Sequence, residues 1–116
     1  MEAAGGDIRE VIRQLNSALG GTLVASLAGA TDPRVSYEWA REGGPQPGAG
    51  AVERLRFAYE QWRMVSDLEG DSVARAWFIG ANPWLGDDTP VNAIRDGQWA
   101  AVAAAAKALV DDSFSA

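Results

Sequence analysis

The sequence predicts an all-α fold, with an N-terminal helix-turn-helix bundle joined by a long helix to a small helical C-terminal region. Three observations support this prediction. Apolar residues recur every three or four positions in several segments. Glycines and the cap-and-proline pairs Asp32-Pro33 and Thr89-Pro90 separate these segments. No run of residues alternates between apolar and polar with a period of two, which is the pattern of a half-buried strand.

The first half of the chain predicts three helices. The first ends at Gly20-Gly21, where glycine suits the backbone of a C-terminal cap. The second is short, follows Thr22 and breaks at Gly29. The third covers residues 32–42, because Asp32 can accept backbone N–H bonds and a proline fits the first helical position. The residues that share an apolar face are Ile8, Val11, Ile12, Leu15 and Leu19, then Leu23, Val24, Leu27 and Ala28, then Val35, Ser36 and Trp39.

A loop rich in glycine and proline, residues 43–50, marks the boundary between two predicted regions, residues 1–48 and residues 49–116. The longest helix follows over residues 51–67 and has apolar side chains on two sides. Such a helix is usually buried between two layers, so we expect it to bridge the two halves of the molecule. Its main stripe is Val52, Leu55, Tyr59, Trp62 and Val65, with Phe57 and Met64 outside the stripe.

Three shorter helices are predicted in the rest of the chain. One begins near Asp71 and stops before Asn82-Pro83, since the residue before a proline avoids the helical conformation. The next starts at Thr89-Pro90 and is short. The last covers residues 98–110, and residues 111–116 are expected to form a tail without periodicity.

Composition limits the classes of function. The chain has 116 residues and a formal net charge of −6, which argues against a protein whose whole surface binds nucleic acid. Residues 1–65 hold 7 basic and 8 acidic side chains, whereas residues 66–116 hold 3 and 8, so the excess negative charge lies in the second half. That half would suit a basic partner, although charge also serves solubility.

The absence of cysteine and histidine excludes disulfides, thiol catalysis, zinc fingers and histidine general bases. The carboxylate pairs Asp87-Asp88 and Asp111-Asp112 have no further ligand at metal-binding spacing, so no metal and no cofactor is expected. We therefore do not expect an enzyme. No apolar run is long enough to span a bilayer, and residues 1–7 do not resemble a signal peptide, which predicts a cytoplasmic protein that does not contact a membrane.

The second and third predicted helices form a helix-turn-helix pattern, in which small residues at Ala25 and Ala28 let the helices cross closely around the turn at Gly29. In a DNA-binding version the third helix would enter the major groove, and its candidate DNA contacts are Arg34, Ser36, Tyr37 and Arg41. This helix holds two arginines against three acids, a poor match to a phosphate backbone. A scaffold or a dimer surface is the alternative role for the pattern.

The order of several short motifs resembles the Xre/MbcA/ParS family of antitoxins, the partners of RES-domain toxins. The resemblance covers residues 8–110. In the first half it rests on the Gly29 turn, Trp39 and a downstream proline, Pro45 or Pro47. The further matching residues are Arg54-Leu55, Ala58-Tyr59, Ala76-Trp77-Phe78, Asn82-Pro83, Leu85-Gly86, Pro90, Arg95-Asp96-Gly97 and the alanine-rich final helix.

The resemblance implies an Xre-like helix-turn-helix and a C-terminal toxin-binding region. RES toxins consume NAD⁺ by phosphorolysis or hydrolysis, or use it for ADP-ribosylation, and their antitoxins cover the active-site cleft. The chain would then be the antitoxin of a type II toxin–antitoxin pair, acting as a homodimer or in a hetero-oligomer with the toxin, with operator DNA as a second partner through autoregulation. A stand-alone helix-turn-helix transcriptional regulator and an adaptor for a different protein are the alternatives.

The toxin contacts expected from this resemblance lie around Asn82-Pro83 and at the C-terminal end. Trp84 follows a proline in a loop and is the expected exposed anchor, because tryptophan is enriched at binding hot spots. Trp77 and Trp99 lie on helical stripes and are expected in the core. The full set of predicted toxin-binding residues is Trp84, Leu85, Lys107, Val110, Asp111, Asp112, Phe114 and Ala116.

Overall fold

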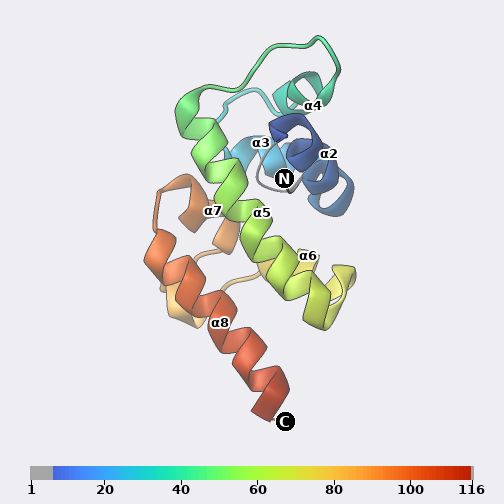
Figure 1. Cartoon of the computed structure of the whole chain (residues 1–116). Coiled ribbons are helices and arrows are strands. Elements are labelled where there is room, and N and C mark those ends of the chain that lie inside the picture. The colour runs from blue at the N-terminus through green and yellow to red at the C-terminus, as the bar shows by residue number, and fades with distance from the viewer. Residues whose placement is uncertain (1–6, 116) are drawn as a thin grey trace.

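The computed structural model describes residues 7–115, with side chains through residue 112, and every regular element within them is a helix. The predicted all-α class is therefore confirmed for this part of the chain (Figure 1). The elements are α2 (Ile8–Leu19), α3 (Gly21–Leu27), α4 (Val35–Ala40), α5 (Ala49–Glu69), α6 (Asp71–Ile79), the 3-10 turn η1 (Pro83–Leu85), α7 (Pro90–Arg95) and α8 (Trp99–Ser115).

Helix α2 forms where the apolar spacing predicts it. Its first turn is capped by the carboxylate of Asp7, which accepts hydrogen bonds from the backbone N–H groups of Arg9 (3.0 Å) and Glu10 (3.4 Å). Gly20, with a φ of +89°, ends the helix as predicted, because its backbone reaches a region that other residues rarely adopt. The buried face of α2 is Val11, Ile12, Leu15 and Leu19.

The start of α4 differs from the prediction. The helix begins at Val35 and ends at Ala40, and therefore does not cover residues 32–42. The reason is local: the carboxylate of Asp32 accepts a hydrogen bond from the backbone N–H of Arg34 (2.9 Å), which forms a turn of its own before the helix. Helix α3 likewise begins at Gly21, with no side-chain cap from Thr22.

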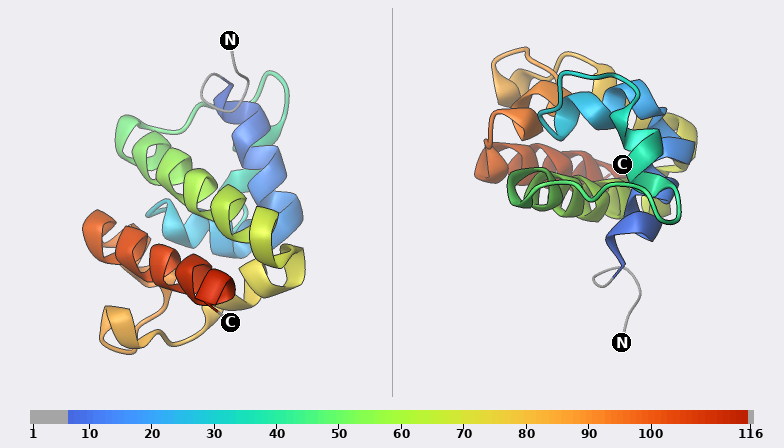
Figure 2. Two further views of the ribbon diagram at one scale, coloured as in Figure 1. Left: turned by 60° about the horizontal axis from the view of Figure 1, so that its bottom comes forward. Right: turned by 90° about the horizontal axis from the view of Figure 1, so that it is seen from above.

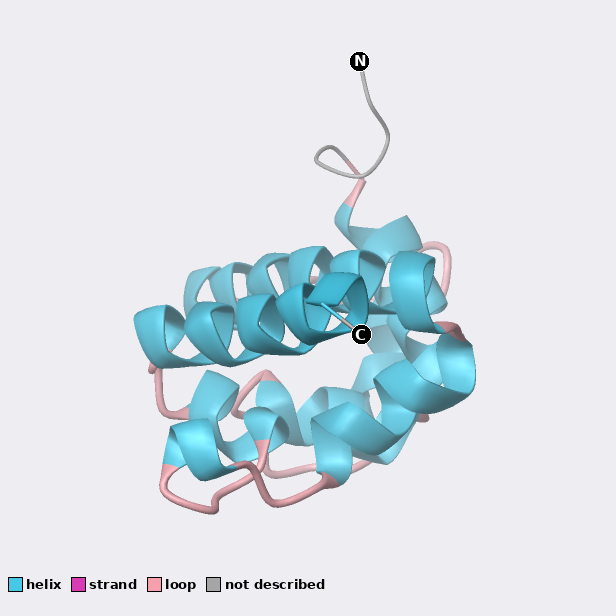
Figure 3. Ribbon diagram, turned by 90° about the horizontal axis from the view of Figure 1, so that it is seen from below, coloured by secondary structure: helices cyan, strands magenta, loops and turns pink. Residues whose placement is uncertain are grey.

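Helix α5 is the central element, as its two apolar sides predict, and it contacts α2, α3, α6, α7 and α8. Figures 2 and 3 show α5 and α8 lying side by side over the shorter helices. Phe57 of α5 packs on Trp99 of α8 with ring centroids 4.8 Å apart. One hydrophobic core runs from Val11 in α2 to Ala105 in α8. The core is thus continuous across the predicted boundary between residues 48 and 49.

The C-terminal helix is longer than predicted. The sequence prediction ends it at Val110 and makes residues 111–116 a tail, whereas α8 continues to Ser115. The apolar spacing that predicts the helix does not continue into residues 111–115, which are mostly polar, so the pattern gives no sign that the helix extends over them. In the view of Figure 1 the last turns of α8 extend past the neighbouring helices.

Within residues 7–115, no helix combines the length and the apolar character that crossing a bilayer requires.

Candidate functional site

The loop after α6 is closed by its own backbone hydrogen bonds. The carbonyl of Asn82 accepts hydrogen bonds from the N–H groups of Leu85 and Asp87, both at 2.9 Å, and the N–H of Asn82 donates to the carbonyl of Asp88 at 3.0 Å. The side-chain oxygen of Asn82 caps η1 by accepting from the N–H of Trp84 at 2.9 Å. Asn82 is itself buried. Residues 82–88 therefore form a compact knuckle that is closed by hydrogen bonds around Asn82.

This knuckle exposes one large aromatic side chain. Trp84 is 61% exposed, more than any other large hydrophobic side chain in the described part of the chain. Its position matches the predicted exposed anchor. Leu85 is also predicted as a toxin contact, and it is only 9% exposed and packs in the main core. Its contact with a toxin stays a prediction. The turn of η1 points neighbouring side chains in different directions, which the sequence pattern does not reveal.

A groove joins the knuckle to the end of α8. It has a volume of about 160 Å³, and both Trp84 and Asp112 line it. We call it the Trp84 groove, and its lining residues are Trp77, Asn82, Pro83, Trp84, Ala105, Ala108, Leu109 and Asp112. Trp77 is half-buried, with its ring edge-on to Phe78 at 5.1 Å, and so it contributes to both the core and the groove. The groove brings together two residues that the sequence predicts as toxin contacts.

The two acidic residues near the end of α8 have different surroundings. The carboxylate of Asp111 accepts a hydrogen bond from the Nζ of Lys107 at 2.7 Å, one helical turn away. Asp112 lines the Trp84 groove, and its side chain makes no hydrogen bond or ion pair with the residues that the structure describes. Both side chains are exposed. Only one of the two predicted carboxylates therefore faces the groove.

The remaining predicted toxin contacts are spread around α8. Lys107 is exposed and is engaged with Asp111, while Val110 is partly buried. Phe114 and Ala116 fall outside the residues whose side chains the structure describes.

Hydrogen bonds connect the end of the knuckle to the start of α7. Thr89 caps α7 by accepting from the N–H of Asn92 at 3.1 Å, as its cap-and-proline pattern predicts. Asp88 accepts hydrogen bonds from the side-chain amide of Asn92 and from the N–H of Thr89, both at 2.8 Å. These bonds, the one from Asn92 first, lower the pKa of Asp88 from its ordinary value because they stabilise the charged carboxylate.

The predicted DNA contacts are not gathered on one free surface. Ser36 is fully buried and its hydroxyl donates to the carbonyl of Gly21 at 2.8 Å, so its contact with DNA stays a prediction that this conformation does not support. Tyr37 is 55% exposed, but its hydroxyl accepts from the N–H of Gly21 at 3.0 Å. Arg34 and Arg41 are exposed, and Arg34 lies 4.0 Å from the carboxylate of Asp32.

Arg9 fixes the end of α4, a role that the sequence analysis missed. Its guanidinium donates to the carbonyls of Trp39 (2.9 Å), Arg41 (2.6 Å) and Gly44 (2.9 Å). These carbonyls lie at and beyond the last turn of a helix, where backbone acceptors lack helical partners. An arginine at the polar edge of α2 was the only available signal, and it is a weak one.

Several residues that carry the family resemblance meet in a shallow pocket of about 490 Å³ between the α3–α4 loop, α5 and α7. Arg54 donates from Nε to the carbonyl of Arg95 at 2.8 Å and from Nη1 to the carbonyl of Gly50 at 3.2 Å. Arg95 lies 3.7 Å from the carboxylate of Asp96. These contacts join the end of α7 to the start of α5. Arg54 and Arg95 therefore have a structural role in this fold.

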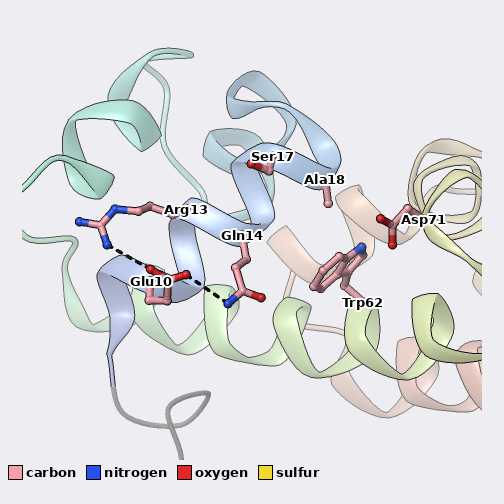
Figure 4. Close-up of a pocket in the computed structure, with 7 residues that line it drawn as sticks. All are labelled: Glu10, Arg13, Gln14, Ser17, Ala18, Trp62 and Asp71. Carbon is pink, nitrogen blue, oxygen red and sulfur yellow. Dashed lines mark hydrogen bonds and ion pairs between the residues drawn. The ribbon is translucent and has the colours of Figure 1, made fainter.

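A second shallow pocket, of about 280 Å³, lies between α2, α5 and the start of α6 (Figure 4). Glu10 accepts hydrogen bonds there from Arg13 (3.1 Å) and Gln14 (3.2 Å). The indole nitrogen of Trp62 is buried beside it without a hydrogen-bond partner in the described structure. Across residues 7–112, no group of three or more acidic side chains could hold a metal ion.

Comparison with protein-family models, with curated proteins and with solved structures gives no match for this chain.

Proposed function

We propose that the chain is an antitoxin that neutralises a RES-domain, NAD-consuming toxin by binding it with its C-terminal face and blocking its active site. The observation that supports this proposal best is the Trp84 groove. It combines an exposed tryptophan on a hydrogen-bonded knuckle with an acidic side chain on the last turns of α8. Interfaces commonly use such an arrangement, in which a large aromatic anchor is surrounded by polar groups.

The shape of the C-terminal end supports a blocking mechanism. Helix α8 continues through Ser115 and extends past its neighbours in Figure 1. A cleft that binds the pyrophosphate of NAD⁺ requires positive charge, so acidic groups at the end of a helix can compete for it by charge-assisted hydrogen bonds. Asp111 and Asp112 are exposed there.

Operator binding through α3 and α4 has less support. The helix α4 has six residues, and its candidate contact Ser36 is buried against α3. The hydroxyl of Tyr37 is also engaged with α3. We propose that this pair of helices acts mainly as a scaffold, because its polar groups hold the helices to one another. In a gel-shift assay, specific binding of the isolated protein to the DNA upstream of its gene would instead favour the alternative of a transcriptional regulator.

The toxin proposal is tested by co-expressing the chain with a RES-domain protein encoded beside its gene, while bacterial growth and cellular NAD⁺ are measured. The full chain is expected to restore both. A variant that stops after Val110 is expected to lose neutralisation, because it lacks Asp112 and the end of α8. Its stability should change by less than about 1 kcal/mol, since the described side chains that the deletion removes, Asp111 and Asp112, are both exposed.

The matched control is Leu68→Ala, which removes an exposed apolar side chain from α5. It should neutralise like the unmodified chain. Urea unfolding of each variant separates lost binding from lost folding. Full neutralisation by the truncated chain would contradict the blocking mechanism, and no neutralisation by the full chain would contradict the antitoxin proposal itself.

A further inference from the structure

We infer that the Trp84 groove receives one cationic side chain, an arginine, from the partner protein. The inference rests on the proposed function in one respect, since the partner that supplies this arginine is the toxin. The nature of the occupant follows from three features of the groove: its size, its lining and its charge.

The size of the groove fits a single side chain. Sites for small molecules and cofactors usually measure about 300–1,000 Å³. The Trp84 groove measures about 160 Å³, which is the volume of roughly five water molecules in the liquid. It is therefore too small for a nucleotide cofactor and large enough for one long side chain of another protein.

The lining of the groove suits a side chain with an apolar stem. Ala105, Ala108 and Leu109 supply apolar surface from α8, and Pro83 supplies it from the knuckle. The only amide in the lining is Asn82, whose side-chain oxygen is already engaged with the N–H of Trp84. Arginine and lysine place their methylene stems along such apolar surfaces while the charged head reaches a polar partner.

The polar partner in the groove is Asp112, and no basic side chain lines the groove beside it. Its carboxylate has no hydrogen bond or ion pair within the described residues, whereas the neighbouring Asp111 is engaged by Lys107 at 2.7 Å. Trp77 and Trp84 add aromatic surface, which attracts cations. An acidic side chain would meet the like charge of Asp112, and a neutral one would leave its carboxylate unpaired.

Arginine fits better than lysine because its guanidinium stacks on aromatic rings and pairs with a carboxylate through two N–H groups. The groove is also formed before binding, since the knuckle is held by backbone hydrogen bonds and the opposite wall is a helix. A preformed site loses less conformational entropy when the partner binds.

The test uses the whole, ¹⁵N-labelled chain and three capped amino acids as probes. The indole N–H signals of the five tryptophans are followed by NMR during titration, with Trp84→Phe identifying the signal of Trp84. N-acetyl-argininamide should shift the Trp84 and Trp77 signals with saturation at about 10 mM. N-acetyl-glutaminamide and the amide of N-acetyl-glutamate should bind at least about fivefold more weakly, because neither carries a cation.

Two neighbouring carboxylates provide matched variants. Asp112→Asn should weaken binding of the arginine probe about fivefold by removing the ion pair in the groove. Asp111→Asn makes the same change of charge one residue earlier, outside the groove, and should change the affinity less than about twofold.

Three outcomes would overturn the inference: no saturable shift with the arginine probe, equal shifts with all three probes, or equal effects of the two variants. Binding of the RES-domain protein is measured in parallel by calorimetry with the same variants. If the toxin binds while the probe fails, the proposed function survives and the arginine groove does not. If the probe binds as expected and the toxin does not, the groove stands and the toxin is the wrong partner.

Discussion

The helices α3 and α4 and the knuckle beside α8 use their polar groups in opposite ways. Around α4, Ser36 and Tyr37 hydrogen-bond to Gly21, and Arg9 binds the carbonyls that follow the helix. Around the knuckle the backbone of Asn82 bonds to Leu85, Asp87 and Asp88, but the side chains of Trp84 and Asp112 are left facing solvent. A helix-turn-helix pattern in the sequence therefore does not by itself indicate an available binding surface, because such a surface needs groups that the fold has left unpaired.

Trp84→Ala should produce the largest effect, a loss of binding by the C-terminal face. Removing an aromatic anchor from the centre of an interface costs about 2–4 kcal/mol of binding free energy. The free energy of unfolding should change by less than about 0.5 kcal/mol, because the side chain is 61% exposed. Calorimetric binding to the RES-domain protein and urea unfolding measure the two effects. A large loss of stability with unchanged affinity would show that Trp84 is a structural residue.

Arg9→Ala should produce the opposite pattern from the N-terminal side. It removes a guanidinium that binds three carbonyls, and hydrogen bonds to charged groups contribute about 1.5–3 kcal/mol to stability. Urea unfolding should show that loss, while toxin affinity at a temperature where the variant is folded should remain unchanged. Arg13→Ala is the control, because its ion pair with Glu10 is exposed and contributes less than about 0.5 kcal/mol. Equal stability of both variants would contradict the role given to Arg9.

The smallest effect should come from Asp88 and depend on pH. Hydrogen bonds from Asn92 and Thr89 lower its pKa in the folded protein. The stability that Asp88 contributes is therefore present above the unfolded pKa of about 3.9, and it is lost as the pH falls through the lower folded pKa. The midpoint of urea unfolding should be measured as the pH is lowered into that acidic range. It should fall less steeply with decreasing pH for Asp88→Asn than for the unmodified chain. Parallel pH profiles would mean that these hydrogen bonds do not favour the charged form.

Most of the fold follows from spacing and caps in the sequence. The stripe from Ile8 to Leu19 gives α2, and Thr89-Pro90 gives the start of α7, where the predicted cap is present at 3.1 Å. Two helix ends were predicted wrongly for identifiable reasons. Asp32 forms a local turn and does not cap a helix, and residues 111–115 of α8 do not continue the apolar spacing of the helix before them.

The candidate site was predictable only in part. Trp84 stands after a proline in a break between helices, which is enough to expect exposure. Ser36 precedes Trp39 by three residues, and this spacing places both on one helix face, so its burial could have been anticipated. The placement of Trp84 and Asp112 along one groove depends on how α8 packs against the knuckle. No local pattern in the sequence contains that information.

The unequal exposure of the five tryptophans has a practical consequence. Trp39 is buried, Trp62, Trp77 and Trp99 are partly buried, and only Trp84 among them is exposed. A collisional quencher such as iodide should therefore act mainly on the emission of Trp84, while the other four indoles report on the interior. The molecule thus carries its own optical label at the surface proposed to bind, and occupancy can be followed in unlabelled protein by the loss of quenching.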